Sequence, residues 1–319
     1  MPYYLGIDGG GTKTTCAAGD ESRLLATAIT GPSNIVRVGE SQTRESLEQA
    51  VRQACAAAGI APAEVARTCI GGSGAAHPEL AAKVQQILAA ILPTPIDVVG
   101  DMQIALEAAF DAGPGVIVIA GTGSIAYGRD QQGNTARAGG WGFAIGDEGS
   151  AHWIGREAVR AVLRAADLSG EAREGRVTPQ DSTLAAALMK TWGVTSLADL
   201  ARAANAIPPP NFAALFPAVA ASEDDLAKQV LTRAGRELAQ VTVVVTRRLF
   251  PVGEIKTVPV AMIPVAMTGG VFRHAPLVRQ VFYNELRKLD PRVEINPQVV
   301  EPVEGALRLA RRVAKSESA

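Results

Sequence analysis

A run of three glycines near the start of the sequence carries residue types that suit phosphate chemistry. Asp8 to Thr14 reads Asp-Gly-Gly-Gly-Thr-Lys-Thr. Consecutive glycines let the backbone bend sharply and bring its N–H groups close to an anion, because no Cβ intervenes. Thr12 and Thr14 add hydroxyl donors, and Lys13 adds a positive charge. The carboxylate of Asp8 is an oxygen ligand of the kind that holds hydrated Mg²⁺, so the run predicts a phosphate and magnesium site.

Two alternatives to this interpretation differ in what must accompany the glycines. A P-loop needs a Gly-Lys-Ser/Thr sequence that opens onto a helix, whereas the residues after Lys13 predict a strand. An ordinary hairpin turn is the second alternative, but three glycines exceed what such a turn requires. A phosphate-binding turn between two strands is therefore the favoured interpretation.

Two further glycine turns lie in the second half of the chain. Residues 121–124 (Gly-Thr-Gly-Ser) formally match the start of the dinucleotide fingerprint, which also needs a following helix and an acidic residue about 20 positions on. Residues 124–128 instead predict a strand, and 137–140 hold no acid, so we interpret the turn as a hairpin that clasps a phosphate chain. Residues 268–272 (Thr-Gly-Gly-Val-Phe) end a predicted strand and permit close approach of a flat ring or ribose. A simple strand-to-helix turn is an equal alternative there.

Three acidic residues stand where a carboxylate could act on a ligand. Asp101 follows a predicted strand over 95–99, at the strand end where open sheets bind ligands. It could accept a proton from a substrate hydroxyl or simply cap the following helix, and the residues alone leave both open. Asp147 and Glu148 lie between two glycines, which predicts a loop shaped around a ligand. Their alternative role is to favour the N-terminus of the helix after Ser150.

The elements that must position these turns repeat along the chain. In each half, over residues 3–30 and 116–138, a strand, a Gly/Thr turn, a strand, an acidic turn and a strand follow one another. This order predicts an internal duplication, each half being a β-meander followed by βα elements around a mixed sheet. Glycine hairpins are common, and two unrelated ones are the alternative. Residues 150–250 are rich in helical periodicity, and a last helix is predicted from 302.

The length of 319 residues suggests two domains. We expect an α/β protein with a first domain over 1–114, onto which a helix over 302–316 packs back, and a second domain over 115–301 with a helical insertion. The 31 basic and 32 acidic residues give a formal net charge of -1, which argues against nucleic-acid binding, because such proteins need a basic surplus. No run approaches the roughly 20 apolar residues that span a bilayer, so we expect no membrane partner.

Cysteine and histidine usage excludes two other classes of protein. The three cysteines form no Cys-x-x-Cys pair, which fits a reducing compartment and excludes a disulfide framework. The three histidines are scattered, so no zinc-ligand spacing exists. Residues 1–5 show no basic flank before a long apolar run, and we therefore expect no signal peptide and a cytoplasmic protein.

Two motifs in the second half carry a family resemblance. Residues 139–142 read Gly-Gly-Trp-Gly, and residues 146–155 read Gly-Asp-Glu-Gly-Ser-Ala-His-Trp-Ile-Gly. With the order of the three glycine turns, these motifs resemble the N-acetylglucosamine kinase branch of the BadF/BadG/BcrA/BcrD ATPase family, within the sugar kinase, actin and heat-shock chaperone superfamily. The resemblance covers nearly the whole chain. It implies two ribonuclease-H-like (actin-like ATPase) domains that close over a cleft, with ATP and a sugar between them.

The resemblance also implies a role for each matching position. The residues it places on the phosphates and Mg²⁺ are Asp8, as the metal ligand, and Gly10, Gly11, Thr12, Lys13, Thr122 and Gly123. Those it places near the nucleotide are Gly269, Gly270 and Arg273. Those it places on the sugar are Asn34, Gly140, Trp141, Asp147 and Asp101, the last as catalytic base.

The function implied by the resemblance is phosphorylation of an amino sugar by ATP with Mg²⁺. N-acetylglucosamine, converted to its 6-phosphate, is the first expectation, and glucosamine and N-acetylmuramic acid stay open. Other members of the family are ATPases that activate a partner enzyme through an iron–sulfur cluster. The cysteines of this chain fall in predicted strands and a helix, which argues against electron transfer but leaves an ATPase without a cluster open. A homodimer through the helical second half also stays open.

Overall fold

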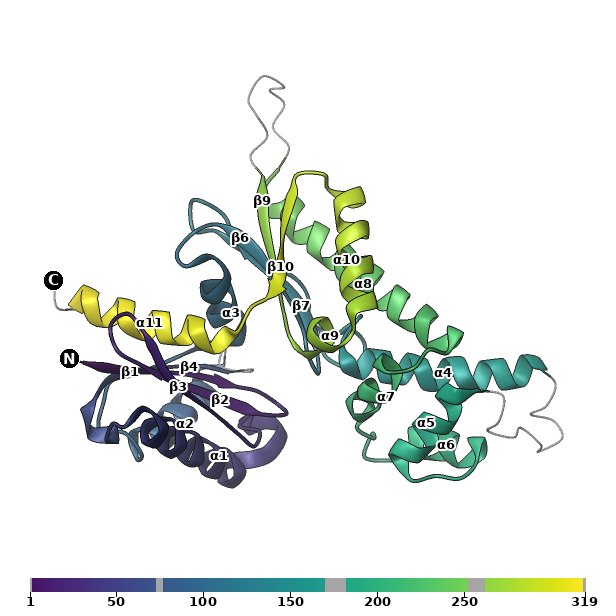
Figure 1. Cartoon of the computed structure of the whole chain (residues 1–319), viewed down its shortest axis with the longest axis horizontal. Helices are drawn as coiled ribbons and strands as arrows, with labels where there is room; N and C mark the ends of the chain where they lie inside the picture. The colour runs from purple at the N-terminus through teal and green to yellow at the C-terminus, as the bar shows by residue number, and fades with distance from the viewer. Residues whose placement is uncertain (1, 73–76, 170–181, 252–261, 318–319) are drawn as a thin grey trace, which may run out of the picture. The chain divides into compact units, whose positions relative to one another are not determined.

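The computed structural model describes residues 2–72, 77–169, 182–251 and 262–317, and these form a mixed α/β structure, as the sequence predicts (Figure 1). The chain divides into two compact units, unit 1 with Met1–Ile117 and Val300–Ala319, and unit 2 with Val118–Val299. Each unit is built around one five-stranded sheet. The domain boundaries expected from the sequence stay a prediction, because compactness alone does not show that a unit folds by itself.

The sheet of unit 1 has the strand order β3-β2-β1-β4-β5. Its strands are β1 (Tyr3–Gly9), β2 (Thr14–Gly19), β3 (Leu24–Thr30), β4 (Val65–Gly72) and β5 (Ile96–Gly100). β1, β2 and β3 form an antiparallel meander, whereas β4 lies parallel to β1 and β5 lies parallel to β4. The carboxyl ends of the three parallel strands therefore meet at one edge of the sheet.

Helices cover both faces of this sheet (Figure 1). The helices of unit 1 are α1 (Ile35–Ala58), α2 (Pro78–Ala89), α3 (Asp101–Phe110) and α11 (Pro302–Glu317), with a short 3-10 turn η1 (Pro62–Glu64) before β4. Because side chains alternate along a strand, Leu5 and Ile7 of β1 join the core under α1 and α2, and Tyr4 joins the core under α3 and α11.

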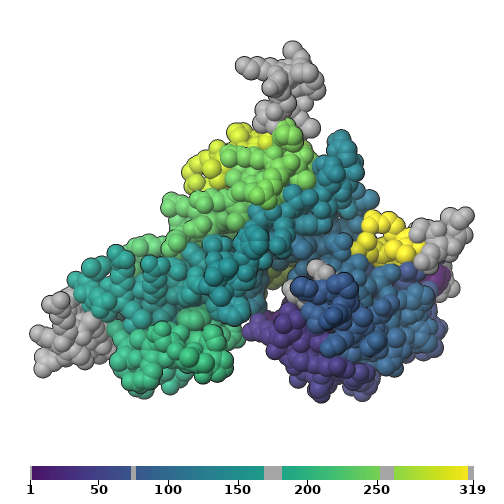
Figure 2. All heavy atoms as spheres, turned by 180° about the vertical axis from the view of Figure 1, so that it is seen from behind, coloured from purple at the N-terminus to yellow at the C-terminus, as the bar shows by residue number. Residues whose placement is uncertain are grey.

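The last helix returns to the start of the chain. Figure 2 shows α11, in yellow, against the purple and blue surface of unit 1. A Cβ at Gly6 would lie 2.3 Å from the backbone nitrogen of Leu307, so α11 packs directly on the backbone of β1. Arg311 Nε donates to Asp20 O over 2.7 Å and fixes the helix to the turn after β2.

The sheet of unit 2 has the order β10-β9-β6-β7-β8. Its strands are β6 (Gly115–Ala120), β7 (Ser124–Arg129), β8 (Thr135–Gly139), β9 (Ile263–Thr268) and β10 (Val293–Val299). Taken in chain order, the first three strands and the last two occupy the same places as those of unit 1. The duplication predicted from the two meanders is therefore confirmed at the level of strand order.

Some helices of unit 2 pack on its sheet, and others pack mainly on other helices. They are α4 (Ala151–Ser169), α5 (Thr183–Trp192), α6 (Leu197–Ala204), η3 (Phe212–Leu215), α7 (Phe216–Ala220), α8 (Asp225–Leu249), α9 (Gly270–His274) and α10 (Pro276–Leu289). α8 packs on β7, β8 and α10, while α5, α6 and α7 pack on α4. No helix within the described ranges is long and apolar enough to cross a membrane.

Two elements differ from the sequence-based expectation. The spacing of apolar residues predicts the first helix over 40–58, but it begins at Ile35, and Gly39 (φ 77°) interrupts it, which is why regular periodicity starts only after that glycine. β10 was not expected at all, because its sequence contains Asn296-Pro297, a pair typical of turns.

Candidate functional site

The first glycine turn joins β1 to β2 in unit 1. Gly10 N–H donates to Lys13 O over 3.0 Å, and Gly10 O accepts from the N–H groups of Ser33 and Asn34 over 3.1 and 3.2 Å. A Cβ at Gly10 would lie 2.7 Å from Lys13 O, whereas at Gly11 the nearest atom ends a flexible side chain. Gly10 therefore shapes the turn.

The hydroxyl of Thr14 has a structural role and not the phosphate-binding role that the sequence suggested. The residue is fully buried. Its Oγ1 donates to Gly31 O over 2.7 Å and also lies 2.7 Å from Ser33 Oγ. Thr14 thus fixes the segment before α1 against the turn, while Thr12 and Lys13 are exposed and can face a ligand.

Two candidate carboxylates lie at the same edge of the first sheet. Asp8 is near the end of β1, and Asp101 is the first residue of α3, directly after β5. The pKa of Asp8 is raised to about 7, first because burial disfavours its charged form and next because the charge of Asp101 repels it. Lys13 counteracts this shift in the pKa of Asp8. The structure therefore brings Asp101 and Lys13 within electrostatic reach of Asp8.

Two charged residues at this edge are not predicted as site residues by the sequence. Glu301, just before α11, adds to the repulsion that raises the pKa of Asp8. Nη1 of Arg37 would lie 3.3 Å from a Cβ at Gly11, which puts a cation beside the glycine turn. Nothing in local spacing links Glu301 to the start of the chain. A basic residue in the first turn after Gly-Pro-Ser-Asn was an available signal for Arg37.

The donor set at this edge suits Mg²⁺. Within the described ranges, no three Asp, Glu, His or Cys side chains are close enough to hold a metal ion together. Mg²⁺ usually keeps several waters and takes only one or two carboxylates besides substrate phosphates. An enclosed carboxylate whose pKa is raised by neighbouring negative charge, as at Asp8, would be stabilised by such a cation.

Asn34 and Asp101 also have local structural roles. Asn34 is the N-cap of α1, and its Oδ1 accepts from the N–H groups of Val36 and Arg37 over 3.1 and 3.3 Å. A sugar contact through Asn34 would therefore use its amide NH₂. The N-cap of α3 is Gly100 rather than Asp101, whose Oδ1 accepts from Met102 N–H over 2.9 Å.

The second glycine turn joins β6 to β7 in unit 2. Gly121 N–H donates to Gly123 O over 2.9 Å. A strand and not a helix follows, so the turn is not a dinucleotide fingerprint, as the sequence predicts. The first turn of α4 fixes the hairpin, because Ala151 N–H donates to Gly121 O over 2.8 Å and His152 N–H donates to Thr122 O over 3.3 Å.

The carboxylate of Asp147 lies directly against this turn. A Cβ at Gly123 would lie 2.8 Å from Asp147 Oδ2, and Asp147 Oδ1 accepts from Gly142 N–H over 3.2 Å. Burial, followed by the charge of Glu148, raises the pKa of Asp147 although the N–H groups of Gly142 and Ser124 oppose this. Asp147 also has φ 59°, an uncommon conformation that concentrates at functional sites.

The loop before Asp147 exposes large apolar side chains. Trp141 is 68% exposed, Phe143 52% and Ile145 82%. Gly140 adopts φ 67°, and a Cβ there would lie 2.6 Å from Ile125 Cδ1, so the loop packs closely on β7 before it turns outward. Contiguous exposed apolar side chains are typical of contact surfaces.

The third glycine turn ends β9. Gly269 has φ 105°, and a Cβ there would lie 2.3 Å from Ala120 O, so the fold itself requires this glycine. Gly270 has no atom within 4 Å of its Cβ position, and Arg273 in α9 is exposed. A strand-to-helix turn thus explains why residue 269 is glycine, while Gly270 has space beside it for a ligand.

The expected site residues fall into two groups, one in each unit. Unit 1 holds Asp8, Gly10, Gly11, Thr12, Lys13, Asn34 and Asp101, and unit 2 holds Thr122, Gly123, Gly140, Trp141, Asp147, Gly269, Gly270 and Arg273. The cysteines belong to neither group. Cys16, Cys55 and Cys69 are at most 1% exposed, and burial raises the pKa of the Cys69 thiol to about 12, which does not favour thiolate ligation of an iron–sulfur cluster.

Two curated proteins are similar to part of the chain. An N-acetylmuramic acid/N-acetylglucosamine kinase of Clostridium acetobutylicum is 38% identical over 173 residues, 54% of this chain and 56% of the relative. An N-acetyl-D-glucosamine kinase of Dictyostelium discoideum is 32% identical over 178 residues, 52% of this chain and 56% of the relative. The chain thus spans about half the length of the curated relatives it matches.

Solved structures resemble nearly the whole chain. A candidate N-acetylglucosamine kinase from Chromobacterium violaceum has a TM-score of 0.74 and 26% identity, covering 97% of this chain and 99% of that one. A ROK family glucokinase from Streptomyces griseus, solved with glucose and AMPPNP, has a TM-score of 0.61 and 17% identity, covering 97% and 99%, and supports the fold alone. The fold is that of the actin-like ATPases. A family model for the BadF/BadG/BcrA/BcrD ATPases matches residues 5–310, and the chain therefore belongs to that family.

Proposed function

We propose that the chain is an ATP-dependent amino-sugar kinase that transfers the γ-phosphoryl group to O6 of N-acetylglucosamine. The observation that carries the proposal is that the carboxylates of Asp8 and Asp101 lie near each other at one sheet edge, beside the glycine turn. Phosphoryl transfer needs phosphate positioning, charge neutralisation and a carboxylate that accepts the hydroxyl proton. The names of the curated relatives support the substrate class.

Each residue group of unit 1 has a distinct task in this proposal. The backbone N–H groups and Lys13 in the turn over 10–13 bind phosphate oxygens. Asp8 holds Mg²⁺, which when bound neutralises charge on the β- and γ-phosphates. Asp101 accepts the proton of the attacking hydroxyl, because it stands at the carboxyl end of β5 beside Asp8.

The residues of unit 2 bind and orient the nucleotide and the sugar in this proposal. Thr122 and Gly123 contact the phosphate chain from a hairpin that is fixed by the first turn of α4. Gly270 and Arg273 lie near the nucleotide. Asp147 accepts hydrogen bonds from sugar hydroxyls, and the exposed Trp141 ring covers the sugar with Gly140, while Asn34 of unit 1 contributes its amide. We expect the enzyme to act in the cytoplasm on small molecules.

The test is ADP release from Mg-ATP, measured without sugar and with N-acetylglucosamine, glucosamine, N-acetylmuramic acid and glucose in turn. N-acetylglucosamine should raise turnover far above the sugar-free rate, and its 6-deoxy analogue should not, because it lacks the attacking hydroxyl. Equal ADP release in all samples would instead favour an ATPase that acts on a partner enzyme. Stimulation by glucosamine or N-acetylmuramic acid alone would keep the kinase and change its sugar.

A further inference from the structure

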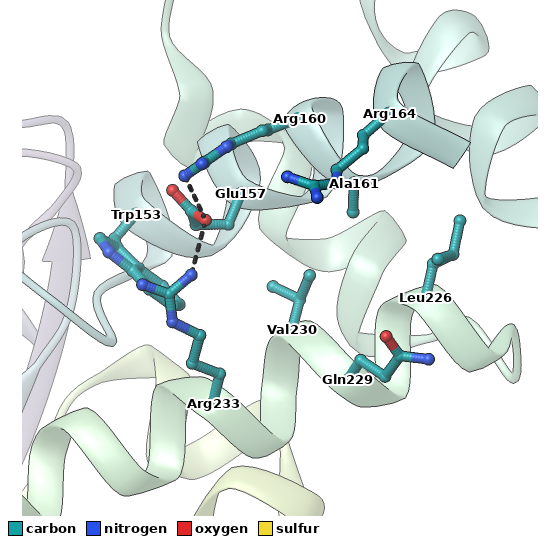
Figure 3. Close-up of a pocket in the computed structure, with 9 residues that line it drawn as sticks. All are labelled: Trp153, Glu157, Arg160, Ala161, Arg164, Leu226, Gln229, Val230 and Arg233. Atoms are coloured by element: carbon teal, nitrogen blue, oxygen red, sulfur yellow. Dashed lines mark hydrogen bonds and ion pairs between the residues drawn. The ribbon is translucent and has the colours of Figure 1, made fainter. Parts of the chain in front are cut away.

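A pocket in unit 2 is lined by none of the expected site residues. It is formed between α4 and α8 and has a volume of about 240 Å³ (Figure 3). Small-molecule sites usually span roughly 300–1,000 Å³, so the pocket suits a small ligand. Its apolar lining comes from Ala161, Leu226 and Val230, and the ring of Trp153 lies at one end.

Three arginines surround this apolar lining. They are Arg160 and Arg164 on α4 and Arg233 on α8. Glu157 is the carboxylate among the described lining residues; it accepts from Arg233 Nη1 over 3.0 Å and pairs with Arg160 Nη1 over 3.5 Å. Three positive charges against one negative charge leave an excess of two positive charges in the lining. Glu237, just outside the lining, offsets part of this excess at Arg233, and the pocket is suited to an anion.

Arg233 is held in place before any ligand binds. Its guanidinium lies 5.0 Å from the centroid of the Trp153 ring, and its Nε pairs with Glu237 over 3.4 Å. With the bond to Glu157, these contacts fix a guanidinium at the pocket wall, and a fixed donor loses little entropy on binding.

Arg164 is the opposite case. Its exposed side chain has no ion pair or hydrogen bond to any residue in the described ranges, and it extends from α4 toward the gap between the two helices (Figure 3). Gln229, across the gap on α8, adds an amide to the lining. A planar guanidinium that has no carboxylate partner among the described residues is well suited to bidentate binding of a phosphate.

We infer that this pocket binds a small organic phosphate monoester. The phosphate group would be held by Arg164 with Arg160 and Arg233, and the carbon skeleton would lie on Ala161 and Val230. The apolar lining distinguishes this ligand from free inorganic phosphate, which would leave those side chains uncovered.

The test uses Trp153 as a reporter. The chain has three tryptophans, so the double variant Trp141→Phe, Trp192→Phe leaves the indole at the pocket as the sole tryptophan. Its fluorescence is titrated with glucose 6-phosphate, with inorganic phosphate and with sodium chloride at matched ionic strength. A saturable change with glucose 6-phosphate, at lower concentration than with phosphate, is expected. Chloride should give no saturable change.

Arg164→Gln in the same background should weaken glucose 6-phosphate binding about tenfold, since a hydrogen bond to a charged group is lost. Arg236→Gln is the matched control, because Arg236 is an exposed arginine of α8 that does not line the pocket, and it should leave binding unchanged. Calorimetric titration of the chain with its natural tryptophans, with and without Arg164→Gln, repeats the comparison. Equal binding by both arginine variants, or tighter binding of inorganic phosphate, would overturn the inference.

Discussion

The two hairpin turns occupy equivalent places in sheets of the same strand order, yet their surroundings differ in charge. The turn of unit 1 lies beside Asp8, whose pKa responds to the charges of Lys13, Asp101 and Glu301. The turn of unit 2 is held by backbone bonds from α4 and faces one enclosed carboxylate, Asp147. Under the proposed function, one of the two units provides the charges for phosphoryl transfer, and the other provides a fixed shape.

The largest effect is expected where the charges of unit 1 are changed. Asp101→Asn keeps the size of the side chain but removes the proton acceptor, so sugar-dependent kcat should fall about 10²–10⁴-fold, as measured by ADP release. Asp111→Asn is the matched control, since Asp111 ends the same helix with an exposed side chain and asparagine has nearly the same shape as aspartate. Similar activity of the two variants would mean that Asp101 is not the base.

The next effect concerns how closely unit 1 packs behind its charged edge. A Cβ at Gly71 would lie 2.3 Å from Cδ1 of the fully buried Ile104 in α3. Gly71→Ala should therefore lower the free energy of unfolding by about 1–3 kcal/mol, as measured by urea denaturation. At Gly72 the nearest atom is 4.0 Å away, and Gly72→Ala should change stability by less than about 0.5 kcal/mol.

A double variant makes this packing test sharper. Ile104→Ala removes the atoms that a Cβ at Gly71 would meet. The free energies of unfolding of Gly71→Ala and Ile104→Ala should therefore be non-additive, with the second substitution costing less in the presence of the first. Additive effects would show that α3 moves freely away from β4.

A smaller effect is expected at the turn of unit 2. Gly123→Ala would bring a Cβ to 2.8 Å from Asp147 Oδ2, so the carboxylate must shift, and kcat/KM should fall about tenfold, as expected for one misplaced hydrogen-bonding group. Gly121→Ala should be much milder, because no atom lies within 4 Å of its Cβ position. Equal losses would indicate that both glycines matter for backbone freedom rather than for the contact with Asp147.

The smallest effect concerns acid stability of unit 2. Asp290 is buried but its pKa is lowered, because hydrogen bonds from Arg292 and Thr246 outweigh the cost of burial. The ionised carboxylate therefore stabilises the folded state at pH values above the ordinary pKa of about 3.9. This stabilisation is lost as the pH falls below that value toward the lowered pKa. Asp290→Asn should therefore cost about 1–2 kcal/mol at pH 7, and the difference in urea midpoint should shrink below about pH 4. A constant difference down to pH 2 would contradict the ionic cause.

The sequence was informative where chemistry and local structure coincide. Glycine runs between apolar strands predict both the turns and the sheets, because glycine freedom and strand alternation are local properties. Asp101 could be placed at a sheet edge for the same reason. Gly269 shows the limit of this reasoning, since its close contact is with Ala120 O, in a strand distant along the chain.

Other features depend on tertiary contacts that spacing does not reveal. Glu301 acts on Asp8 only because α11 packs back onto β1. The hydroxyl of Thr14 was assigned to phosphate, but the fold uses it to hold Gly31 and Ser33. The pocket between α4 and α8 arises from two helices far apart in sequence, so its arginines gave no local signal.

The most direct test of the proposed kinase is the ratio of sugar phosphate formed to ADP released, with N-acetylglucosamine and Mg-ATP as substrates. Both products can be quantified by ³¹P NMR in one sample. One N-acetylglucosamine 6-phosphate for each ADP is the expected result. ADP accompanied by inorganic phosphate, with no sugar phosphate, would contradict the proposal.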